Sequence, residues 1–530
     1  MSNERKLLSG NEAVALGAMH AGCALGVGYP GTPSTEILEN YSKLENCKAQ
    51  WSPNEKVALE VGIGVAYSGT RTLVTMKHVG VNVAADPLFT VAYTGVTGGM
   101  VLAVADDPGM ASSQNEQDSR NYARAAGIPM LEPADSQEAY DMTKLAFELS
   151  ERWKQPVFLR LCTRVCHSKT IVEPSDSTPV PQADYVRNIQ QRVMIPAYAR
   201  PAHKTLRAKL ADMEVWNSTE GPNPVTGSGS LGIIANGVAA LHALEAAPEA
   251  RVMKLGMVYP LPMKAILEFI DSVDDCIIVE EGDPFIQTEV MAAGGQVRPR
   301  LERYRFGELD VVRVKRIIDR DDSDEPVPPR GKPPQLCDSC PHRASFQMLK
   351  SMDCIITGDI GCYTLSVLPP FETMDTCVCM GASIGVGLGM RHVLPEEQAR
   401  RVVSVIGDGT FMHSGLTGVA DMVYNRPETG HVIVILDNGT TAMTGLQEHP
   451  GTGKKLDHLP AEKTVSIEDA VIAMGVDNVV VLDPSREMDR FEQVMKDALA
   501  SNDLTVVIAR RPCILAIVRD AKFERGEKVR

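Results

Sequence analysis

The chain has 530 residues, of which 44% are hydrophobic and 23% are charged, a composition typical of a globular protein with more than one domain. Its formal net charge of −15 argues against nucleic acid or an anionic membrane as a partner, because both require a basic surface. No run of about 18 apolar residues could span a membrane, and the N-terminus lacks the pattern of a secretion signal. We therefore expect a cytoplasmic protein.

Residues 1–185 alternate short apolar runs with helical patterns, which predicts a doubly wound parallel α/β sheet. A strand at 24–29 runs into Thr32, which we expect at the strand's carboxyl end, where backbone amides are exposed. Glu55 opens a later helix. From local pattern alone, Thr32 is equally well explained as a turn or cap residue, and a carboxylate at Glu55 is favoured by the helix N-terminus.

The middle of the chain divides less clearly. Residues 112–118 are polar and predict an exposed loop, and residues 186–230 show no clear period, so we expect a connecting segment with some helix. Residues 227–232 match a dinucleotide fingerprint, but the strand follows the glycines instead of preceding them, which argues against NAD. A second, smaller α/β domain is predicted at 231–325, followed by an acidic and proline-rich linker.

The third predicted domain, 326–530, contains the most informative stretch. The β-branched runs 403–406 and 432–436 predict two buried parallel strands, which end in Gly407-Asp408-Gly409 and in Asp437-Asn438. Open α/β sheets hold ligands at this edge. Asp408 and Asn438 would offer oxygen ligands to Mg²⁺, and the two glycines would let a phosphate approach the backbone. The predicted ligand is a magnesium-bound diphosphate.

Four cysteines of the same domain form a second candidate site. Cys337 and Cys340 are spaced as C-x-x-C, and Cys362 and Cys513 each follow a predicted strand of the same domain. These four thiols predict either an iron–sulfur cluster or a zinc site, with ordinary buried thiols as the alternative. Small residues around Cys377 and Cys379 favour packing for that pair. The eleven histidines show no zinc spacing and are interpreted as surface or packing residues.

These motifs resemble a known family. Gly407-Asp408-Gly409, 28 intervening residues and Asn438 look like the diphosphate-binding motif of thiamine diphosphate enzymes. The segment 29–33 with Asn54-Glu55 resembles the pyrimidine-binding domain of the 2-oxoacid:ferredoxin oxidoreductases. Segments 358–363 and 413–418 are in the style of the large subunits of its indolepyruvate branch. The resemblance covers essentially the whole chain and implies three doubly wound domains: pyrimidine-binding, transketolase C-terminal-like and diphosphate-binding.

The resemblance also implies roles for particular residues. Asp408, Asn438 and the carbonyl of Thr440 would ligate Mg²⁺, and Gly361, Cys362 and Thr444 would join Gly407 and Gly409 in binding the cofactor. Glu55 would hydrogen-bond the aminopyrimidine and so promote loss of the thiazolium proton, while Thr32 would bind the substrate carboxylate. The cofactor would act as the electron sink when CO2 leaves. Cys337, Cys340, Cys362 and Cys513 would hold one [4Fe–4S] cluster.

The expected activity is oxidative decarboxylation of an aryl 2-oxoacid such as indolepyruvate to its acyl-CoA. The expected partners are a smaller subunit, a ferredoxin or other iron–sulfur acceptor, CoA and the 2-oxoacid, in a hetero-oligomer containing a homodimer. Family members usually carry a C-terminal ferredoxin-like domain, whereas only Cys513 follows Cys379 here, so electrons would leave through another subunit or the chain is truncated. The alternatives are a non-oxidative thiamine-dependent decarboxylase and a scaffold with a decayed site. Whether one chain or two complete each thiamine site stays open.

Overall fold

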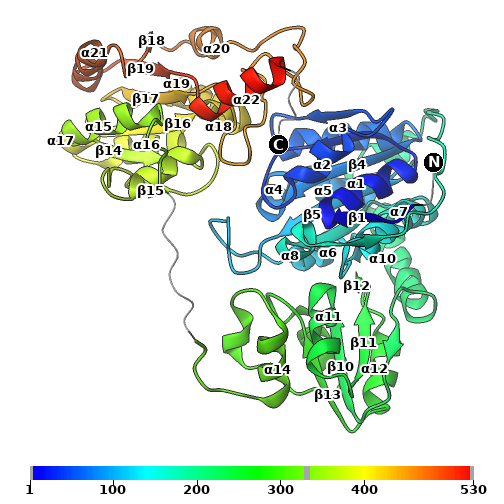
Figure 1. Cartoon of the computed structure of the whole chain (residues 1–530). Helices are drawn as coiled ribbons and strands as arrows, with labels where there is room; N and C mark the ends of the chain where they lie inside the picture. The colour runs from blue at the N-terminus through cyan, green and yellow to red at the C-terminus, as the bar shows by residue number, and fades with distance from the viewer. Residues whose placement is uncertain (1–3, 327–334, 526–530) are drawn as a thin grey trace. The chain divides into compact units, whose positions relative to one another are not determined.

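The computed structural model describes residues 4–326 and 335–525. The chain divides into two compact units, Met1–Pro326 and Val327–Arg530, and Figure 1 colours them from blue to green and from yellow-green to red. The predicted linker lies partly outside the described residues. Each unit is a mixed α/β structure built on parallel sheets, which confirms the predicted fold class.

The first unit contains a seven-stranded sheet in the order β12-β6-β7-β5-β4-β2-β3, parallel except for β12. Its central strands are fully buried, as expected for a parallel sheet covered on both faces. The strands are β2 (Cys23–Gly28), β3 (Ala49–Trp51), β4 (Arg71–Lys77), β5 (Met100–Asp106), β6 (Met130–Leu131), β7 (Val157–Cys162) and β12 (Met257–Tyr259).

Helices cover this sheet between its strands. A capping box is present at the start of α1, where the side chains of Ser9 and Glu12 each bond the other residue's backbone amide. Helix α3 packs against β2 and β4, and α7 packs against β5 and β7. The helices are α1 (Gly10–His20), α2 (Thr35–Tyr41), α3 (Glu55–Tyr67), α4 (His78–Val83), α5 (Ala85–Thr94), α6 (Ser119–Ala126), α7 (Ser136–Trp153) and α8 (Thr163–His167).

The segment after α8 is more regular than we predicted. Strand β8 (Lys169–Val172) pairs antiparallel with β1 (Lys6–Ser9), and the short α9 (Ile189–Arg192) precedes α10 (Pro196–Thr219), a helix of 24 residues. The segment contains helix, as predicted, but the prediction of no clear period is wrong for α10, because a narrow stripe of that helix is buried. That stripe has a helical spacing and consists of Leu206, Leu210, Met213, Trp216 and Asn217.

A four-stranded sheet completes the first unit, in the order β13-β10-β11-β9. Its core lies between the parallel strands and helices α11 and α14, where small alanines of α11 allow close packing. The elements are β9 (Val225–Thr226), β10 (Leu231–Asn236), α11 (Gly237–Ala246), β11 (Arg251–Leu255), α12 (Met263–Asp271), β13 (Asp275–Val279), α13 (Phe285–Ala292), a 3₁₀ turn (Glu302–Arg305) and α14 (Val311–Asp319).

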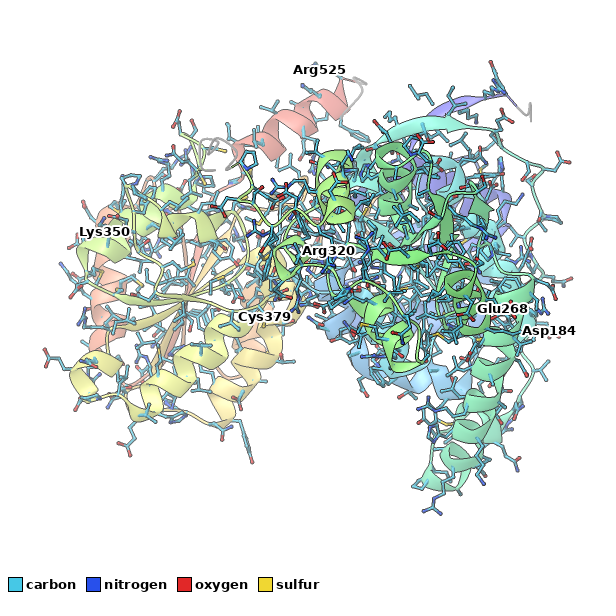
Figure 2. All side chains as sticks on the ribbon, turned by 90° about the horizontal axis from the view of Figure 1, so that it is seen from below. Asp184, Glu268, Arg320, Lys350, Cys379 and Arg525 are labelled. Atoms are coloured by element: carbon cyan, nitrogen blue, oxygen red, sulfur yellow. The ribbon has the colours of Figure 1, made fainter. Side chains whose placement is uncertain are left out.

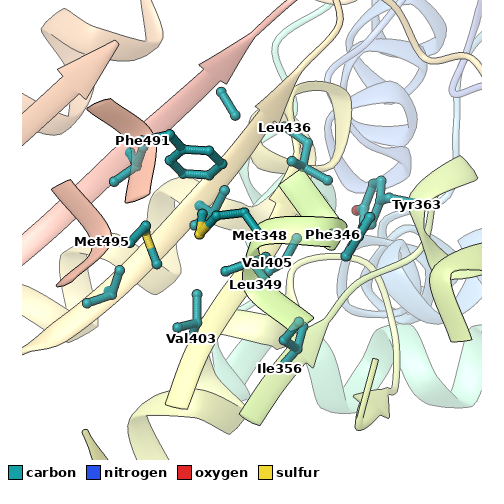
Figure 3. Packing of buried hydrophobic residues seen from close by; sticks show 14 of the residues in the cluster. Phe346, Met348, Leu349, Ile356, Tyr363, Val403, Val405, Leu436, Phe491 and Met495 are labelled. Carbon is teal, nitrogen blue, oxygen red and sulfur yellow. The ribbon is translucent and has the colours of Figure 1, made fainter. Parts of the chain in front are cut away.

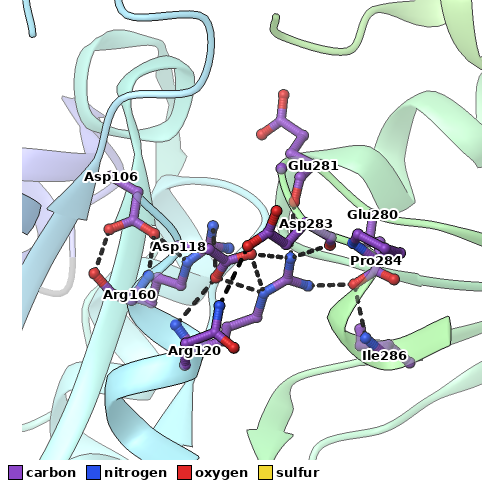
Figure 4. A network of polar contacts seen from close by, with 12 residues as sticks. Asp106, Asp118, Arg120, Arg160, Glu280, Glu281, Asp283, Pro284 and Ile286 are labelled. Carbon is purple, nitrogen blue, oxygen red and sulfur yellow. Dashed lines mark hydrogen bonds and ion pairs between the residues drawn. The ribbon is translucent and has the colours of Figure 1, made fainter. Parts of the chain in front are cut away.

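A buried ionic network joins the two sheets of the first unit (Figure 4). Arg120 of α6 donates to Asp118 at 2.9 Å, to Glu280 at 2.5 Å and to the carbonyl oxygen of Glu281 at 2.8 Å. Glu280 also accepts the amides of Ile286 and Gln287 in the first turn of α13. The exposed loop predicted at 112–118 is therefore wrong for Asp118, which is buried because Arg120 needs a carboxylate partner inside the protein.

The second unit is one six-stranded parallel sheet in the order β15-β14-β16-β17-β19-β18. Its elements in chain order are α15 (His342–Ser351), β14 (Ile355–Gly358), a 3₁₀ segment (Cys362–Val367), β15 (Thr376–Cys377), α16 (Ala382–Val393), α17 (Glu396–Ala399), β16 (Val402–Gly407), α18 (Asp408–Thr410), a π-helical turn (Phe411–Gly415), α19 (Leu416–Tyr424), β17 (His431–Asp437), α20 (Ile467–Ala473), β18 (Asn478–Leu482), α21 (Met488–Ala500), β19 (Leu504–Arg510) and α22 (Ile514–Glu524).

Side chains of the central strands alternate between two cores. Val403 and Val405 face a cluster with Phe346 of α15 and Phe491 of α21 (Figure 3), whereas Ile406 faces the opposite cluster, which includes residues of α16, α19 and α20. This period of two is the geometry of a strand buried on both faces. It holds the strand ends, and the polar residues that follow them, in a rigid frame. Among the residues that the structure describes, none forms a helix both long and apolar enough to cross a bilayer.

Candidate cofactor site

The polar residues that follow four neighbouring strands meet at the carboxyl edge of the six-stranded sheet. Cys362 follows β14, Asp408 follows β16, Asn438 follows β17 and Cys513 follows β19. These strands are adjacent in this order and all run parallel. The edge is therefore where a doubly wound fold would hold a ligand.

Asp408 is buried and accepts several hydrogen bonds at this edge. Its Oδ1 accepts the amide of Gly409 at 2.9 Å, and its Oδ2 accepts the amide of Gly439 at 2.7 Å. Oδ2 also lies 3.2 Å from Nε2 of His449. Burial opposes ionisation of Asp408, but the His449 imidazole and the two amides hold its pKa below the usual value, so the carboxylate is charged.

Three further side-chain oxygens belong to the segment that follows β17 and are hydrogen-bonded within it. The Asn438 Oδ1 accepts the amide of Thr440 at 3.1 Å, and the Thr440 hydroxyl donates to the carbonyl oxygen of Gln447 at 3.2 Å. Thr444 donates to the Gln447 side chain at 2.6 Å. The hydroxyl of Thr441 is buried and has no hydrogen-bond partner among the described residues. An unsatisfied buried hydroxyl is unusual and suits a site that receives a polar ligand.

The glycines of this site have packing roles as well. A Cβ at Gly407 would lie 2.6 Å from the Tyr363 ring, and one at Gly361 would lie 2.3 Å from the same ring. A Cβ at Gly409 would lie 2.7 Å from the Thr441 hydroxyl. Side chains at these positions would therefore displace Tyr363 or Thr441, whatever ligand is bound.

The four predicted cysteines line one small cavity beside this edge. Its volume is about 70 Å³, and Cys337, Cys340, Cys362 and Cys513 share it with His342 and Asn438. Burial raises the pKa of Cys340 to about 11 and that of Cys362 to about 12, and the neighbouring thiols add to both shifts. Within the described residues, no group of three or more His, Cys, Asp or Glu side chains is arranged closely enough to hold a metal ion.

Cys377 and Cys379 do not line that cavity, and both are exposed; Figure 2 labels Cys379 among the side chains of the second unit. The predicted packing of this pair is therefore wrong. Cys377 belongs to β15, a strand of two residues at the edge of the sheet, which has no strand on its outer side to cover it.

Two histidines were missed as site residues by reasoning from spacing. His342 is the first residue of α15, and its Nε2 lies 3.0 Å from the Asn438 side-chain nitrogen. His449 contacts Asp408 as described above. Both rings are buried, and burial lowers the pKa of His342 to about 4. The only local signal was the place of His342 two positions after Cys340.

In the first unit, Glu55 and Thr32 lie at the carboxyl edge of the seven-stranded sheet. Thr32 follows β2, and Glu55 follows β3, which pairs with β2. Asn54 caps α3, so Glu55 begins the helix as predicted. The Glu55 side chain is buried and packs against Gly80 of α4, where a Cβ would lie 2.6 Å from it. Glycine at 80 thus leaves room for the buried carboxylate.

Two family models match the chain. One is described as "Thiamine pyrophosphate enzyme, C-terminal TPP binding domain" and matches residues 359–509; the other is described as "Pyruvate flavodoxin/ferredoxin oxidoreductase, thiamine diP-bdg" and matches residues 16–219. Indolepyruvate oxidoreductase subunit IorA of Archaeoglobus fulgidus is 40% identical over 98% of this chain and 88% of its own length. The chain belongs to the indolepyruvate oxidoreductase IorA family.

The Pyrococcus abyssi member of the IorA family is 38% identical over 99% of this chain and 88% of its own length. A solved 2-oxoglutarate:ferredoxin oxidoreductase from Magnetococcus marinus is also similar, with a TM-score of 0.47 and 14% identity over 56% of this chain and 61% of that one. The IorA family places the chain among subunits of thiamine diphosphate-dependent 2-oxoacid:ferredoxin oxidoreductases, and the family resemblance inferred from the sequence is confirmed.

Proposed function

We propose that the chain catalyses, within a hetero-oligomer, the oxidative decarboxylation of an aryl 2-oxoacid such as indolepyruvate. In this reaction the C1–C2 bond of the oxoacid breaks to release CO2, and the acyl carbon forms a thioester with CoA. The thiol proton is released, and two electrons pass one at a time to a ferredoxin or another iron–sulfur acceptor. The observation that carries the proposal is that one strand end links the two features: Asn438 lines the cysteine-lined cavity, and the amide of the next residue, Gly439, donates to Asp408 at 2.7 Å.

The three donor groups proposed for the metal fit magnesium by their chemistry. They are a charged carboxylate, the amide oxygen of Asn438 and the backbone carbonyl of Thr440, and hard oxygen ligands of this kind suit Mg²⁺ better than softer metals. The unpartnered Thr441 hydroxyl would offer a hydrogen bond to a diphosphate oxygen. Gly361, Cys362, Gly407, Gly409 and Thr444 would line the same pocket for the cofactor.

Glu55 and Thr32 would act at the reacting end of the cofactor. When bound, thiamine diphosphate supplies a carbon nucleophile and an electron sink. Glu55 would hold a proton against the aminopyrimidine ring, and its burial makes such a hydrogen bond strong. Thr32 would donate its hydroxyl to the substrate carboxylate.

The cysteine-lined cavity fits a [4Fe–4S] cluster by its chemistry. Four thiols from three separate segments line the cavity, and thiolates are the ligands that iron–sulfur clusters use. Among the described residues the thiols are not close enough to hold a metal ion as they stand, so binding a cluster would have to draw them together. The raised pKa values of Cys340 and Cys362 mean that the thiols stay protonated without a cation, so cluster assembly would have to displace those protons. A cluster here would carry electrons away from the oxoacid carbon.

The remaining partners follow from this assignment. IorA relatives are named as subunits, so the enzyme is a multi-subunit oxidoreductase. A smaller subunit would complete it around a homodimer of this chain, in the cytoplasm, where CoA and ferredoxin are available.

The test is an anaerobic assay of the full chain co-expressed with its smaller subunit. Indolepyruvate, phenylpyruvate and pyruvate are compared with and without CoA, and dye reduction and acyl-CoA are both measured. We expect CoA-dependent dye reduction that is fastest with an aryl oxoacid. Release of an aldehyde without any electron acceptor would instead favour a non-oxidative decarboxylase, and no turnover of any oxoacid would contradict the proposal.

A further inference from the structure

Asn438 lies next to two features of the second unit, the Asp408 site and the cysteine-lined cavity. The amide of the next residue, Gly439, donates to Asp408, and Asn438 itself lines the cavity formed by the four cysteines. The oxygen and the nitrogen of its side-chain amide point apart, so the orientation of this amide decides whether the oxygen can face a bound cation. An amide whose oxygen and nitrogen are not distinguished by partners can occupy either orientation.

His342 distinguishes them. Its Nε2 lies 3.0 Å from Nδ2 of Asn438, and because an amide nitrogen only donates, the imidazole nitrogen must accept. The amide of Thr440 donates to Oδ1 of the same side chain at 3.1 Å. Both contacts select the same orientation, with the nitrogen toward His342 and the oxygen free to offer its second lone pair to a cation.

The position of His342 is itself fixed by the cysteine segment. The amide of Cys340 donates to the carbonyl oxygen of Cys337 at 2.9 Å, which closes a turn, and α15 begins two residues after Cys340. The His342 ring is buried and packs edge-on against Tyr363 at a centroid distance of 6.1 Å. Tyr363 in turn occupies the space that Gly407 and Gly361 leave free. The ring therefore has little freedom to turn away from Asn438.

A second contact ties the same residue to the cavity. The amide of Cys513 donates to the carbonyl oxygen of Asn438 at 2.9 Å. The backbone of Asn438 is thus held by the segment of one cysteine, and its side chain is held through His342 by the segment of another.

We propose that His342 is a positioning residue for the metal–diphosphate site: by accepting a hydrogen bond from Nδ2, it holds the Asn438 oxygen toward the bound cation. This inference rests on the proposed thiamine diphosphate–Mg²⁺ site. His342 does not touch the reacting atoms, and it acts only through the orientation of Asn438. Residues that orient metal ligands in this way typically change metal affinity about tenfold to a hundredfold when they are replaced.

The experiment measures the Kd for Mg²⁺ by calorimetry on the full chain at saturating thiamine diphosphate. His342→Phe keeps the ring shape and removes the acceptor, and we expect its Kd to rise about tenfold to a hundredfold. His342→Gln places an amide oxygen near the lost Nε2, and we expect it to restore a Kd close to that of the unmodified protein. In the assembled enzyme, His342→Phe should raise the Mg²⁺ concentration needed for half-maximal activity more than it lowers kcat.

The matched control is His431→Phe. His431 is also fully buried in the second unit and contacts Ser404 at 2.8 Å, but it begins β17 at the end opposite Asn438. We expect this variant to lose stability without a change in the Kd for Mg²⁺. If His342→Phe loses stability to the same degree and leaves the Kd unchanged, His342 is only a packing residue and the inference is wrong.

Two further outcomes are separable. If His342→Phe does not fold, His342→Asn is compared with His342→Gln, because the shorter side chain cannot reach Asn438; equal Kd values for these two would overturn the inference. If the unmodified chain itself binds no Mg²⁺ with thiamine diphosphate, the proposed function fails and the role of His342 fails with it.

Discussion

Nη1 of Arg120 lies 2.5 Å from Oε2 of Glu280, across 160 positions of sequence, and both side chains are almost completely buried. This contact joins α6 beside the seven-stranded sheet to the end of β13 in the four-stranded sheet. A buried charge of this kind needs its partner, because either group alone would have lost its water without compensation.

Replacing Arg120 with Met should therefore destabilise the first unit by about 3–5 kcal/mol, because Asp118 and Glu280 would remain buried and charged. Urea unfolding measures this loss, and limited proteolysis should cut more rapidly within residues 231–325. The control is Arg124→Met, one helical turn after Arg120 in α6. It removes an exposed ion pair with Glu289 and should lower the free energy of unfolding by less than about 1 kcal/mol. Equal stability of the two variants would contradict the role assigned to Arg120.

Glu281 should make the first unit less stable as the pH rises. Burial raises its pKa to about 7 from an ordinary value near 4.5, so the folded state binds the proton more tightly than the unfolded state. The free energy of unfolding therefore falls as the pH increases from about 4.5 to 7, by roughly 3 kcal/mol in total. Glu281→Gln removes this loss and can still accept the amide of Leu309.

We accordingly expect Glu281→Gln to unfold at the same temperature as the unmodified protein near pH 4.5 and several degrees higher at pH 8. Thermal unfolding at a series of pH values measures the difference. Glu302→Gln, an exposed substitution in the same region, should show no such divergence. A constant difference at all pH values would mean that Glu281 is not protonated in the folded protein.

Asp408→Asn should abolish tight binding of thiamine diphosphate with Mg²⁺. The variant loses the negative charge and one of its two amide-accepting oxygens, so we expect the Kd for Mg²⁺ to rise at least about a hundredfold. Calorimetry on the full chain measures it. Asp483→Asn is the control, because Asp483 also follows a strand of this sheet, β18, but lies at its far edge beside Arg511. A similar loss in both variants would point to general destabilisation.

Cys362→Ser and Cys513→Ser should each lower the iron content of anaerobically reconstituted protein, since four thiolates are required to hold one cluster. Iron and sulfide analysis with visible absorbance measures this. Cys354→Ser serves as the control, because Cys354 is half-buried in the same unit but does not line the cavity. Reconstituted protein that takes up no iron, in any variant or in the unmodified chain, would remove the cluster from the proposal.

Glu55→Gln should reduce turnover of the assembled enzyme by about 10²–10⁴-fold, the usual contribution of a positioned proton-transfer group, while leaving Mg²⁺ binding intact. Steady-state assay with the aryl oxoacid measures it. Glu60→Gln, an exposed change on the same helix, should retain full activity. Normal turnover of Glu55→Gln would exclude the assigned role.

Local sequence determined much of this protein. Strands β16 and β17 could be predicted because their residues are β-branched and apolar on both faces, and the positions of Asp408 and Asn438 at the strand ends followed from those strands. Glu55 at the start of α3 and the capping box of α1 are likewise local, because each depends on residues within one turn of helix. The periodicity of α10 is also local, but it is weak because only one narrow stripe of that helix is buried.

Contacts between distant segments were decided by the tertiary structure alone. Strand β19, the last strand that the structure describes, lies beside β17 with β18 outside it, and this order brings Cys513 next to Asn438. His342 reaches Asn438 across 96 positions, and His449 reaches Asp408 across 41. No local pattern encodes such pairs. They form only when the buried strands pair in a particular order, because that order brings together the residues that follow the strand ends.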